Sequence, residues 1–187
     1  MTRRRLRPAH SPGELARIYA TPHDHRRWRD HHLRVNATIE VARWVADCDG
    51  KVSHAADLSC GNGAVLRAVP AAVRYFGDLA PGYEYTGPIE DTIRQIPPVD
   101  IFVCAETLEH LDDPGTVLAA IRAKTRMLIL STPMDAWDDD NPEHYWAWSR
   151  TDVEEMAAAA GFGVVVFSAV DFRPLGLPYC FGIWGLR

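Results

Sequence analysis

The stretch that decides the expected fold is Asp57-Leu58-Ser59-Cys60-Gly61-Asn62-Gly63. It ends an apolar run at residues 55–59, which is typical of a strand, and it precedes a helical pattern that stops at Pro70. Glycines at a strand-to-helix turn let the backbone approach a ligand closely, because no Cβ stands in the way. We therefore expect a ligand-binding turn at residues 60–63.

Short apolar runs alternate with helical patterns along the rest of the chain. We expect strands at residues 55–59, 73–76, 83–86, 101–104, 127–130, 164–167 and 179–186. We expect helices near residues 11–20, 24–48, 65–69, 113–121 and 151–161. Such alternation indicates an α/β fold whose mostly parallel sheet is covered on both faces. Ligands of these sheets bind beyond the carboxyl ends of the strands.

Three helix signals sharpen the boundaries. Ser11 and Glu14 have the spacing of a capping box, and Thr151 and Glu154 have the same spacing. In the helix expected at 24–48, residues Trp28, His32, Val35, Ile39, Ala42 and Ala46 recur at steps of four and three and predict one apolar face.

The second expected strand ends at Asp78, seventeen residues after Gly61. A carboxylate in this place accepts hydrogen bonds from the two hydroxyls of a ribose. A dinucleotide site would need a third glycine at position 66, where the sequence has Leu66. The pattern therefore favours an adenosine ligand without a pyrophosphate.

Four stretches in order resemble the class I S-adenosylmethionine-dependent methyltransferases: DLSCGNG at 57–63, GD at 77–78, VDIFVCAETLEHLDDP at 99–114 and MLILSTP at 127–133. The resemblance covers residues 54–170 and implies S-adenosylmethionine as the cofactor. It implies a Rossmann-like methyltransferase sheet, mostly parallel with a final antiparallel strand, with helices on both faces and an N-terminal helical cap. We expect one domain, residues 1–187, made of a cap with a basic tail (1–50) and a cofactor-binding core (51–187).

The resemblance also implies the roles of individual residues. Asp57, Gly61 and Gly63 would border the methionine part of the cofactor, Asp78 would bind the ribose, and Leu79 would pack on the adenine. The full expected cofactor set is Asp57, Ser59, Cys60, Gly61, Asn62, Gly63, Asp78, Leu79, Ile89, Glu90, Ala105 and Glu106. Trp28, His31 and Arg34 of the cap are candidates near the cofactor's carboxylate.

The sequence departs from the family pattern between Asp78 and Asp100. A helix normally joins the second and third strands, but few residues separate Asp78 from Tyr83, so the third strand is rudimentary or reached by a tight route. The family's adenine-binding Asp is replaced by Pro88. The backbone of Ile89 and the side chain of Glu90 are the nearest substitutes.

On the acceptor side, we expect catalytic roles for Glu106, His110 and His144. Glu106 would lie beside the sulfonium, and imidazoles titrate near neutral pH, so either His is a candidate base. A structural role for His110 and a loop-ordering hydrogen bond for His144 are the alternatives. Trp137, Tyr145, Trp146 and Trp148 are expected to pack a lid.

A second resemblance, to the small-RNA 3′-terminal 2′-O-methyltransferases, involves a Glu-x-x-Glu-His sequence and a later His. It implies a divalent metal held by Glu106, Glu109, His110 and His144, a donor set that suits magnesium, manganese or zinc. Our main interpretation has no metal. The separate group His23, His25, His31 and His32 is badly spaced for chelation.

We therefore expect O- or N-methylation of a small molecule. The alternative is RNA ribose 2′-O-methylation, or another nucleic-acid methylation, with phosphates bound by an Arg-rich N-terminus. Its arginines are Arg3, Arg4, Arg5, Arg7, Arg26, Arg27 and Arg29. A non-catalytic cofactor-binding subunit is a third possibility. Residues 1–50 carry ten Arg and six acidic residues, whereas residues 51–187 carry ten basic and nineteen acidic residues, so only the N-terminus is basic.

The remaining expectations concern location and assembly. No apolar window reaches the roughly 18–20 residues of a membrane span, and no apolar segment of a secretory signal follows the basic start. The scattered Cys48, Cys60, Cys104 and Cys180 indicate a reducing, cytoplasmic setting. The oligomeric state stays open, because the apolar residues 177–184 fit either a strand or an interface.

Overall fold

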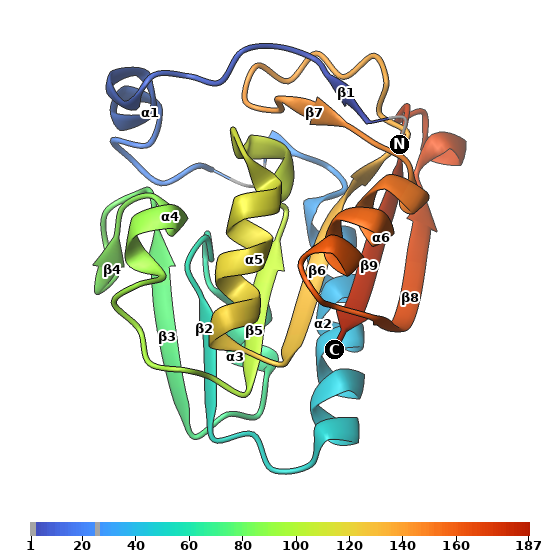
Figure 1. Ribbon diagram of the computed structural model, residues 1–187. Coiled ribbons are helices and arrows are strands. Elements are labelled where there is room, and N and C mark those ends of the chain that lie inside the picture. Colours follow the sequence, from blue (N-terminus) through green and yellow to red (C-terminus); the bar gives the residue numbers. More distant parts are fainter. Residues whose placement is uncertain (1–2, 25–26) are drawn as a thin grey trace.

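The computed structural model describes residues 3–24 and 27–187, and a seven-stranded sheet forms its centre (Figure 1). The strands are β2 (His54–Asp57), β3 (Val73–Asp78), β4 (Tyr85–Thr86), β5 (Ile101–Ala105), β6 (Met127–Met134), β8 (Val164–Asp171) and β9 (Cys180–Leu186). Their order across the sheet is β4-β3-β2-β5-β6-β9-β8, and β9 runs antiparallel to both of its neighbours. The expected Rossmann-like sheet with a final antiparallel strand is confirmed.

Helices cover both faces of this sheet (Figure 1). One face carries α4 (Ile89–Thr92), α5 (Pro114–Lys124) and α6 (Arg150–Ala159), and the other carries α2 (His31–Asp49) and α3 (Ala64–Ala68). Short 3₁₀ helices lie at Leu108–His110 and Arg173–Leu175.

The two faces are built by strand alternation. In β5, Phe102 and Cys104 pack with the helices of one face, while Ile101 and Val103 pack with α2 and α3. Successive side chains of a strand point to opposite faces, so a strand covered on both sides must be apolar throughout. This is why the central strands contain continuous apolar runs in the sequence.

The N-terminal region expected as a cap divides into two parts. Helix α2 begins at His31 rather than at residue 24, and it packs against the sheet. The buried side of α2 includes Arg34, Thr38, Val41 and Val45, together with the expected Ala42 and Ala46. The expected apolar face was therefore partly wrong: His32 is exposed, and Trp28 precedes the helix and is 38% exposed.

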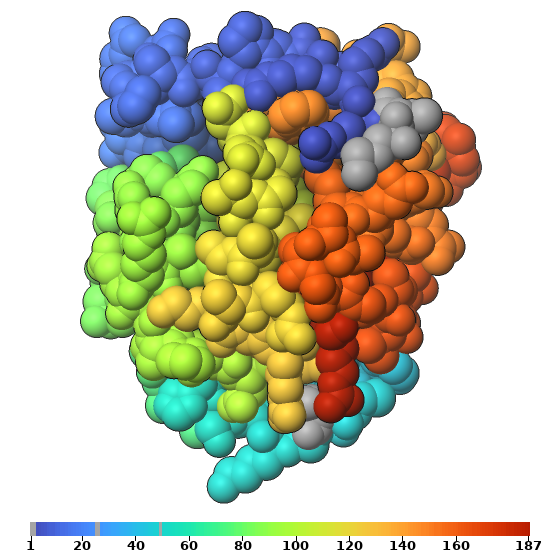
Figure 2. All heavy atoms as spheres, viewed as in Figure 1, coloured from blue at the N-terminus to red at the C-terminus, as the bar shows by residue number. Residues whose placement is uncertain are grey.

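Residues 3–24, which we call the strap, lie across the top of the molecule (Figures 1 and 2). The strap contains β1 (Arg4–Arg5), which pairs antiparallel with β7 (Trp146–Ala147), and α1 (Pro12–Ile18). The capping box at Ser11 and Glu14 is confirmed. The second expected box is wrong, because α6 begins two residues earlier than the spacing suggested and is capped by Ser149 and Asp152.

Strand β4 is a two-residue strand reached from β3 through residues 79–84 without a helix. This confirms the rudimentary third strand. Gly77 permits the tight pairing, since a Cβ there would lie 2.6 Å from the carbonyl oxygen of Tyr85. The Gly87 N–H donates to the Asp78 carbonyl at 2.9 Å and closes the loop.

The apolar C-terminus forms β9, whose residues Phe181–Leu186 are buried inside the sheet. None of the helices in the described part of the chain has the length and apolarity to cross a bilayer.

Candidate functional site

A cavity of about 870 Å³ opens between the carboxyl ends of the strands and the strap. The expected cofactor residues line it with the exception of Gly63, and so do the expected catalytic residues. These lining residues are Asp57, Ser59, Cys60, Gly61, Asn62, Asp78, Leu79, Ile89, Glu90, Ala105, Glu106, His110 and His144. Segments far apart in the sequence are thus brought to one cavity, as the sheet topology predicts.

The glycine turn and Asp78 are joined directly. The Gly61 N–H donates to Asp78 Oδ2 at 2.7 Å, and the Ala80 N–H donates to Asp78 Oδ1 at 2.9 Å. The Tyr83 hydroxyl donates to the Gly61 carbonyl at 2.9 Å, and the Tyr83 ring stacks on Phe76. The backbone and an aromatic ring therefore fix the turn and its carboxylate. Sequence reasoning missed Tyr83, whose role depends on the short loop before β4.

Gly63 has a structural task beneath the cavity. Its φ of 73° is in the left-handed region, and a Cβ there would lie 2.7 Å from the Arg67 guanidinium and 3.0 Å from Phe76. Gly63 starts α3 in this conformation, which glycine adopts without a steric penalty. Gly63 therefore shapes the turn, and its contact with the cofactor stays a prediction.

Asp57 lies at the base of the cavity and is 2% exposed. Burial, with the nearby charge of Asp78, raises the pKa of Asp57 to about 8, although hydrogen bonds from Ser59 oppose the rise. The Ser59 hydroxyl also lies 2.7 Å from the Thr107 hydroxyl, which connects the ends of β2 and β5. Burial likewise raises the pKa of the Cys60 thiol, to about 12.

Glu106 follows β5 with a φ of 53°, an uncommon backbone conformation for a residue with a side chain. Its carboxylate pairs with the guanidinium of Arg34, which is 8% exposed. Arg34 Nε also donates to Asp30 at 2.8 Å, and the Tyr179 hydroxyl donates to Asp30. Arg34 lines the cavity, as do the other expected cap residues, Trp28 and His31.

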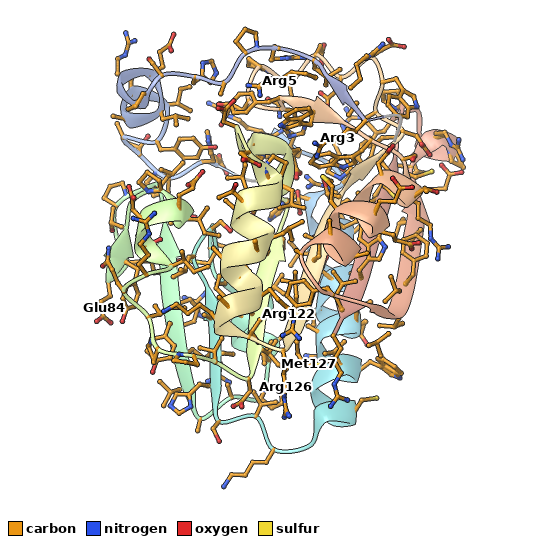
Figure 3. The ribbon with its side chains drawn as sticks, viewed as in Figure 1. Arg3, Arg5, Glu84, Arg122, Arg126 and Met127 are labelled. Carbon is orange, nitrogen blue, oxygen red and sulfur yellow. The ribbon has the colours of Figure 1, made fainter. Side chains whose placement is uncertain are left out.

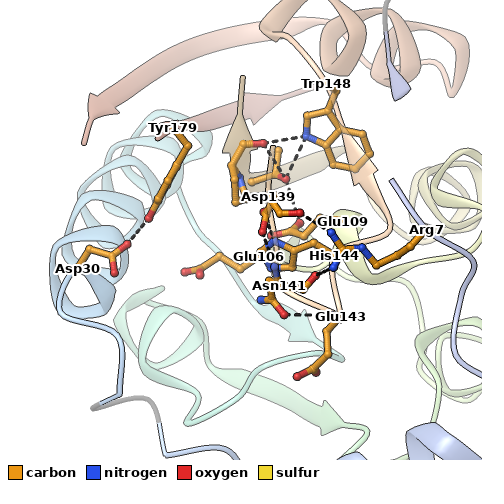
Figure 4. A network of polar contacts seen from close by, with 12 residues as sticks. Arg7, Asp30, Glu106, Glu109, Asp139, Asn141, Glu143, His144, Trp148 and Tyr179 are labelled. Atoms are coloured by element: carbon orange, nitrogen blue, oxygen red, sulfur yellow. Dashed lines mark hydrogen bonds and ion pairs between the residues drawn. The ribbon is translucent and has the colours of Figure 1, made fainter. Parts of the chain in front are cut away.

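This chain of contacts, which we call the Arg34 network, consists of Tyr179, Asp30, Arg34 and Glu106. Figure 4 shows Tyr179 and Asp30 beside each other, with Glu106 between them and His144. Sequence reasoning missed Asp30 and Tyr179, because no local spacing connects the start of α2 with the residue before β9.

His110 and His144 meet edge to face, with ring centroids 4.7 Å apart. His144 Nδ1 lies 2.6 Å from Asp139 Oδ2. Burial alone would lower the pKa of His144, but the bond to Asp139 and the charges of Glu109 and Asp139 raise it. Burial, with repulsion from His144, lowers the pKa of His110 to about 3. His144 is therefore the more basic imidazole, and Asp139 is a partner that sequence reasoning missed.

Glu109 lies beneath these rings and is 2% exposed. It accepts a hydrogen bond from the Thr132 hydroxyl at 2.9 Å, and Trp148 Nε1 donates to the same hydroxyl (Figure 4). Burial raises the pKa of Glu109. One possible ligand atom from each of Glu109, His110 and His144 lies within 4.8 Å of the others. Glu106, the fourth expected metal ligand, is instead paired with Arg34.

The strap is held over the cavity by its arginines. The guanidinium groups of Arg3 and Arg5 lie 5.3 and 4.9 Å from the ring centroid of Trp146, and Figure 3 shows both side chains near β7. Arg5 also pairs with Asp112 at 2.5 Å. Arg7 donates to the backbone carbonyls of Asp139 and Asn141. The expected lid is thus built partly from Trp146, while Tyr145 and Trp148 are buried below it.

The separate histidine group does not converge in the described residues. His23 lies 3.4 Å from Glu143, His31 lines the cavity and His32 is exposed on α2. His25, with Arg26 of the expected basic surface, lies outside the described residues.

No family model and no curated protein matches the sequence. Solved structures do match. Burkholderia thailandensis 1,6-didemethyltoxoflavin-N1-methyltransferase, with 1,6-didemethyltoxoflavin and S-adenosylhomocysteine bound, is 18% identical, with a TM-score of 0.71 over 97% of this chain and 92% of that one. Magnesium protoporphyrin IX methyltransferase from Synechocystis PCC 6803, with bound S-adenosylhomocysteine, is 15% identical, with a TM-score of 0.63 over 93% and 92%.

A third match is the [4+2]-cyclase SpnF, 14% identical, with a TM-score of 0.61 over 81% of each chain. A cyclase and methyltransferases therefore share this architecture, so likeness at these identities describes the fold and not the reaction. The sheet order, the glycine turn and these matches together show that the chain has the fold of the class I S-adenosylmethionine-dependent methyltransferases.

Proposed function

We propose that this protein is an S-adenosylmethionine-dependent methyltransferase that methylates an oxygen or nitrogen of a small molecule. The observation that carries the proposal is the join between the glycine turn and Asp78 inside the cavity. There a carboxylate, fixed by the N–H groups of Gly61 and Ala80, lines the same space as Glu106. An adenosine with a charged amino-acid side arm fits this arrangement of groups.

The cavity offers a partner for each part of such a cofactor. Asp78 would accept the ribose hydroxyls, while Leu79 and Ile89 would border the adenine. Arg34 and Glu106 carry opposite charges and would hold the amino-acid end. When bound, the cofactor supplies an electrophilic methyl group.

The strap supports a small acceptor. It lies over the cavity and, with residues 139–145, leaves a space of about 870 Å³ that cofactor and acceptor must share. The similar structures named above are a methyltransferase of 1,6-didemethyltoxoflavin and one of magnesium protoporphyrin IX. Small acceptors are therefore compatible with this fold.

His144 is our candidate general base. Asp139 accepts a hydrogen bond from Nδ1 of His144. The other ring nitrogen, Nε2, does not contact Asp139, and this orientation suits proton abstraction from a hydroxyl or amine. His110 would position the His144 ring rather than take the proton, since burial lowers its pKa to about 3.

Calorimetric titration with S-adenosylhomocysteine tests the proposal. We expect saturable one-to-one binding, and weaker binding when Gly61→Val inserts a side chain where the cofactor would approach. Gly13→Val is the control, since Gly13 lies in α1 with no atoms within 4 Å of its added Cβ. No binding to the unmodified protein at millimolar ligand contradicts the proposal.

A second candidate, metal-assisted RNA ribose 2′-O-methylation, is favoured by the convergence of Glu109, His110 and His144. A carboxylate with two imidazoles suits a divalent metal, and His110 Nδ1 is buried with no hydrogen-bond partner among the residues that the structure describes. These residues would hold such a metal, which would polarise an acceptor hydroxyl.

Two observations weigh against this second candidate. Glu106 pairs with Arg34, and two arginines of the strap already have partners in their own chain: Arg5 pairs with Asp112, and Arg7 donates to two backbone carbonyls. Metal analysis of the purified protein decides the matter, with Glu109→Gln as the variant. A stoichiometric metal that is lost in the variant favours this function over a metal-free one.

A further inference from the structure

The cavity lining contains more carboxylates than basic side chains, which is the reverse of an anion-binding site. Arg34 is the only lysine or arginine among the described residues that line the cavity, and its guanidinium is already paired with Asp30 and Glu106. Carboxylates line the same space, among them Glu143 and Asp139, of which Asp139 is paired with His144. A negatively charged acceptor would lose its hydration there, and the one arginine among these described lining residues is already paired with two carboxylates, which is unfavourable.

The basic side chains of the strap do not correct this imbalance. Arg5 pairs with Asp112 and stacks on Trp146, and Arg7 donates to two backbone carbonyls. Neither arginine lines the cavity. Among the lining residues the strap therefore contributes aromatic side chains, such as Tyr19 and His23, whereas Arg5 and Arg7 lie outside the cavity lining.

Glu143 is the carboxylate best placed for an acceptor. Its side chain is 18% exposed, and Figure 4 shows it pointing away from the His144 and Asp139 side chains. The contacts that the structure describes for this carboxylate are with the Tyr19 hydroxyl and with His23 Nε2 at 3.4 Å. It thus lines the cavity without a lysine or arginine among these partners.

Aromatic side chains adjoin this carboxylate, which contacts Tyr19 and His23. Tyr19 and His23 pack edge to face with centroids 4.9 Å apart, and His23 and Trp28 follow at 6.1 Å. Tyr145, two residues after Glu143, also lines the cavity. Ring faces next to a carboxylate attract organic cations, because the negative face of each ring adds to the charge attraction.

We propose that the methyl acceptor is an organic cation, an amine carried on an aromatic ring, whose charged nitrogen binds Glu143 among Tyr19, His23 and Trp28. This inference rests on the proposed function and adds the acceptor class to it. Glu143 binds the acceptor and takes no part in methyl transfer, so the acceptor carries its reactive hydroxyl or nitrogen at another position. Phosphorylated and carboxylate acceptors are disfavoured by the same charges.

Three probes of nearly equal shape test the inference: tyramine, which is cationic, 4-ethylphenol, which is neutral, and 4-hydroxyphenylacetate, which is anionic. Each is titrated by calorimetry into the protein saturated with S-adenosylhomocysteine. We expect tyramine to bind at least about tenfold more tightly than either of the others. In Glu143→Gln we expect the three affinities to agree within about twofold, while the affinity for S-adenosylhomocysteine is unchanged.

Glu84→Gln is the matched control, because Glu84 is exposed on the outer side of the sheet edge (Figure 3) and should leave the preference intact. The inference is overturned if the anion binds as tightly as tyramine, if tyramine shows no saturable binding, or if Glu143→Gln keeps the preference. Failure of S-adenosylhomocysteine itself to bind would instead remove the proposed function, so the two failures can be told apart.

Discussion

The two halves of the cavity are built in different ways. The cofactor half is made by the ends of β2, β3 and β5, where the Gly61 N–H of the turn at 60–63 donates to the carboxylate of Asp78, seventeen residues away. The acceptor half is made by the strap and residues 139–145, which are more than a hundred residues apart in sequence. The first half depends on local turn chemistry, whereas the second depends on contacts that only the folded chain creates.

This difference indicates which property a substitution in each half should change. A change in the cofactor half should alter ligand affinity or core stability, because its groups are buried and interlocked. A change in the acceptor half should alter how often the strap opens locally, because its contacts are partly exposed ion pairs and ring contacts. The following variants test that separation.

The largest effect is expected for Arg34→Gln, which removes the cation of the Arg34 network. Breaking a buried ion pair by removing one partner costs roughly 3–5 kcal/mol, because the carboxylate of Asp30 stays buried without a counter-charge. Urea denaturation measures the loss in free energy of unfolding. Arg43→Gln is the control on the same helix, where an exposed pair with Glu40 should contribute about 0.5 kcal/mol. Equal losses in the two variants would show that the network carries no stability.

The next largest effect is expected for Asp78→Ala in the cofactor half. Losing charge-assisted hydrogen bonds to two ribose hydroxyls should weaken S-adenosylhomocysteine binding about 100-fold. Calorimetry measures the change, and Asp91→Ala, at an exposed position of α4, should bind normally. An affinity within threefold of the unmodified protein would place the ribose elsewhere.

The next effect, which accumulates over several pH units, concerns Asp57. The pKa of Asp57 is about 8 in the fold because of burial, whereas an exposed Asp titrates near about 4. Between these values the folded state keeps a proton that the unfolded state releases. The free energy of unfolding therefore falls as pH rises, by up to about 1.4 kcal/mol per pH unit.

Asp57→Asn cannot titrate, so the fall in unfolding free energy with pH between about 5 and 8 should become shallower in this variant. Urea denaturation at several pH values measures both slopes. Identical slopes in the variant and the unmodified protein would mean that Asp57 is already ionised in the fold.

The smallest effect is expected in the acceptor half, for Arg5→Gln. Loss of the Asp112 pair and the Trp146 contact should speed hydrogen exchange at the Leu6 amide, which donates to the Tyr145 carbonyl at 2.8 Å, by about fivefold. S-adenosylhomocysteine affinity should stay within about twofold. Arg4→Gln is the neighbouring control, since its guanidinium lies 3.9 Å from a highly exposed Asp138. A large loss of cofactor affinity in Arg5→Gln would contradict the separation of the two halves.

The alternation of apolar runs and helical patterns predicted the mostly parallel sheet, and the resemblance implied its final antiparallel strand. Strand alternation could be read from the sequence because it depends on neighbouring residues. The residues expected to bind the cofactor line the cavity with the exception of Gly63, and their contacts with the cofactor stay predictions. Sequence reasoning placed the start of α2 too early, since the turn before it has no strong breaker after Pro22. Asp139, Asp30 and Tyr179 were missed, because their roles arise from long-range packing that no spacing encodes.

The central claim is that the glycine turn and Asp78 together hold S-adenosylmethionine with its sulfur toward the acceptor half. The most direct test is a crystal structure with S-adenosylhomocysteine bound. We expect the ribose hydroxyls on Asp78, the amino-acid end between Arg34 and Glu106, and the sulfur facing His144. Density for the ligand away from residues 60–63 and Asp78, or with its sulfur turned from His144, would contradict the account.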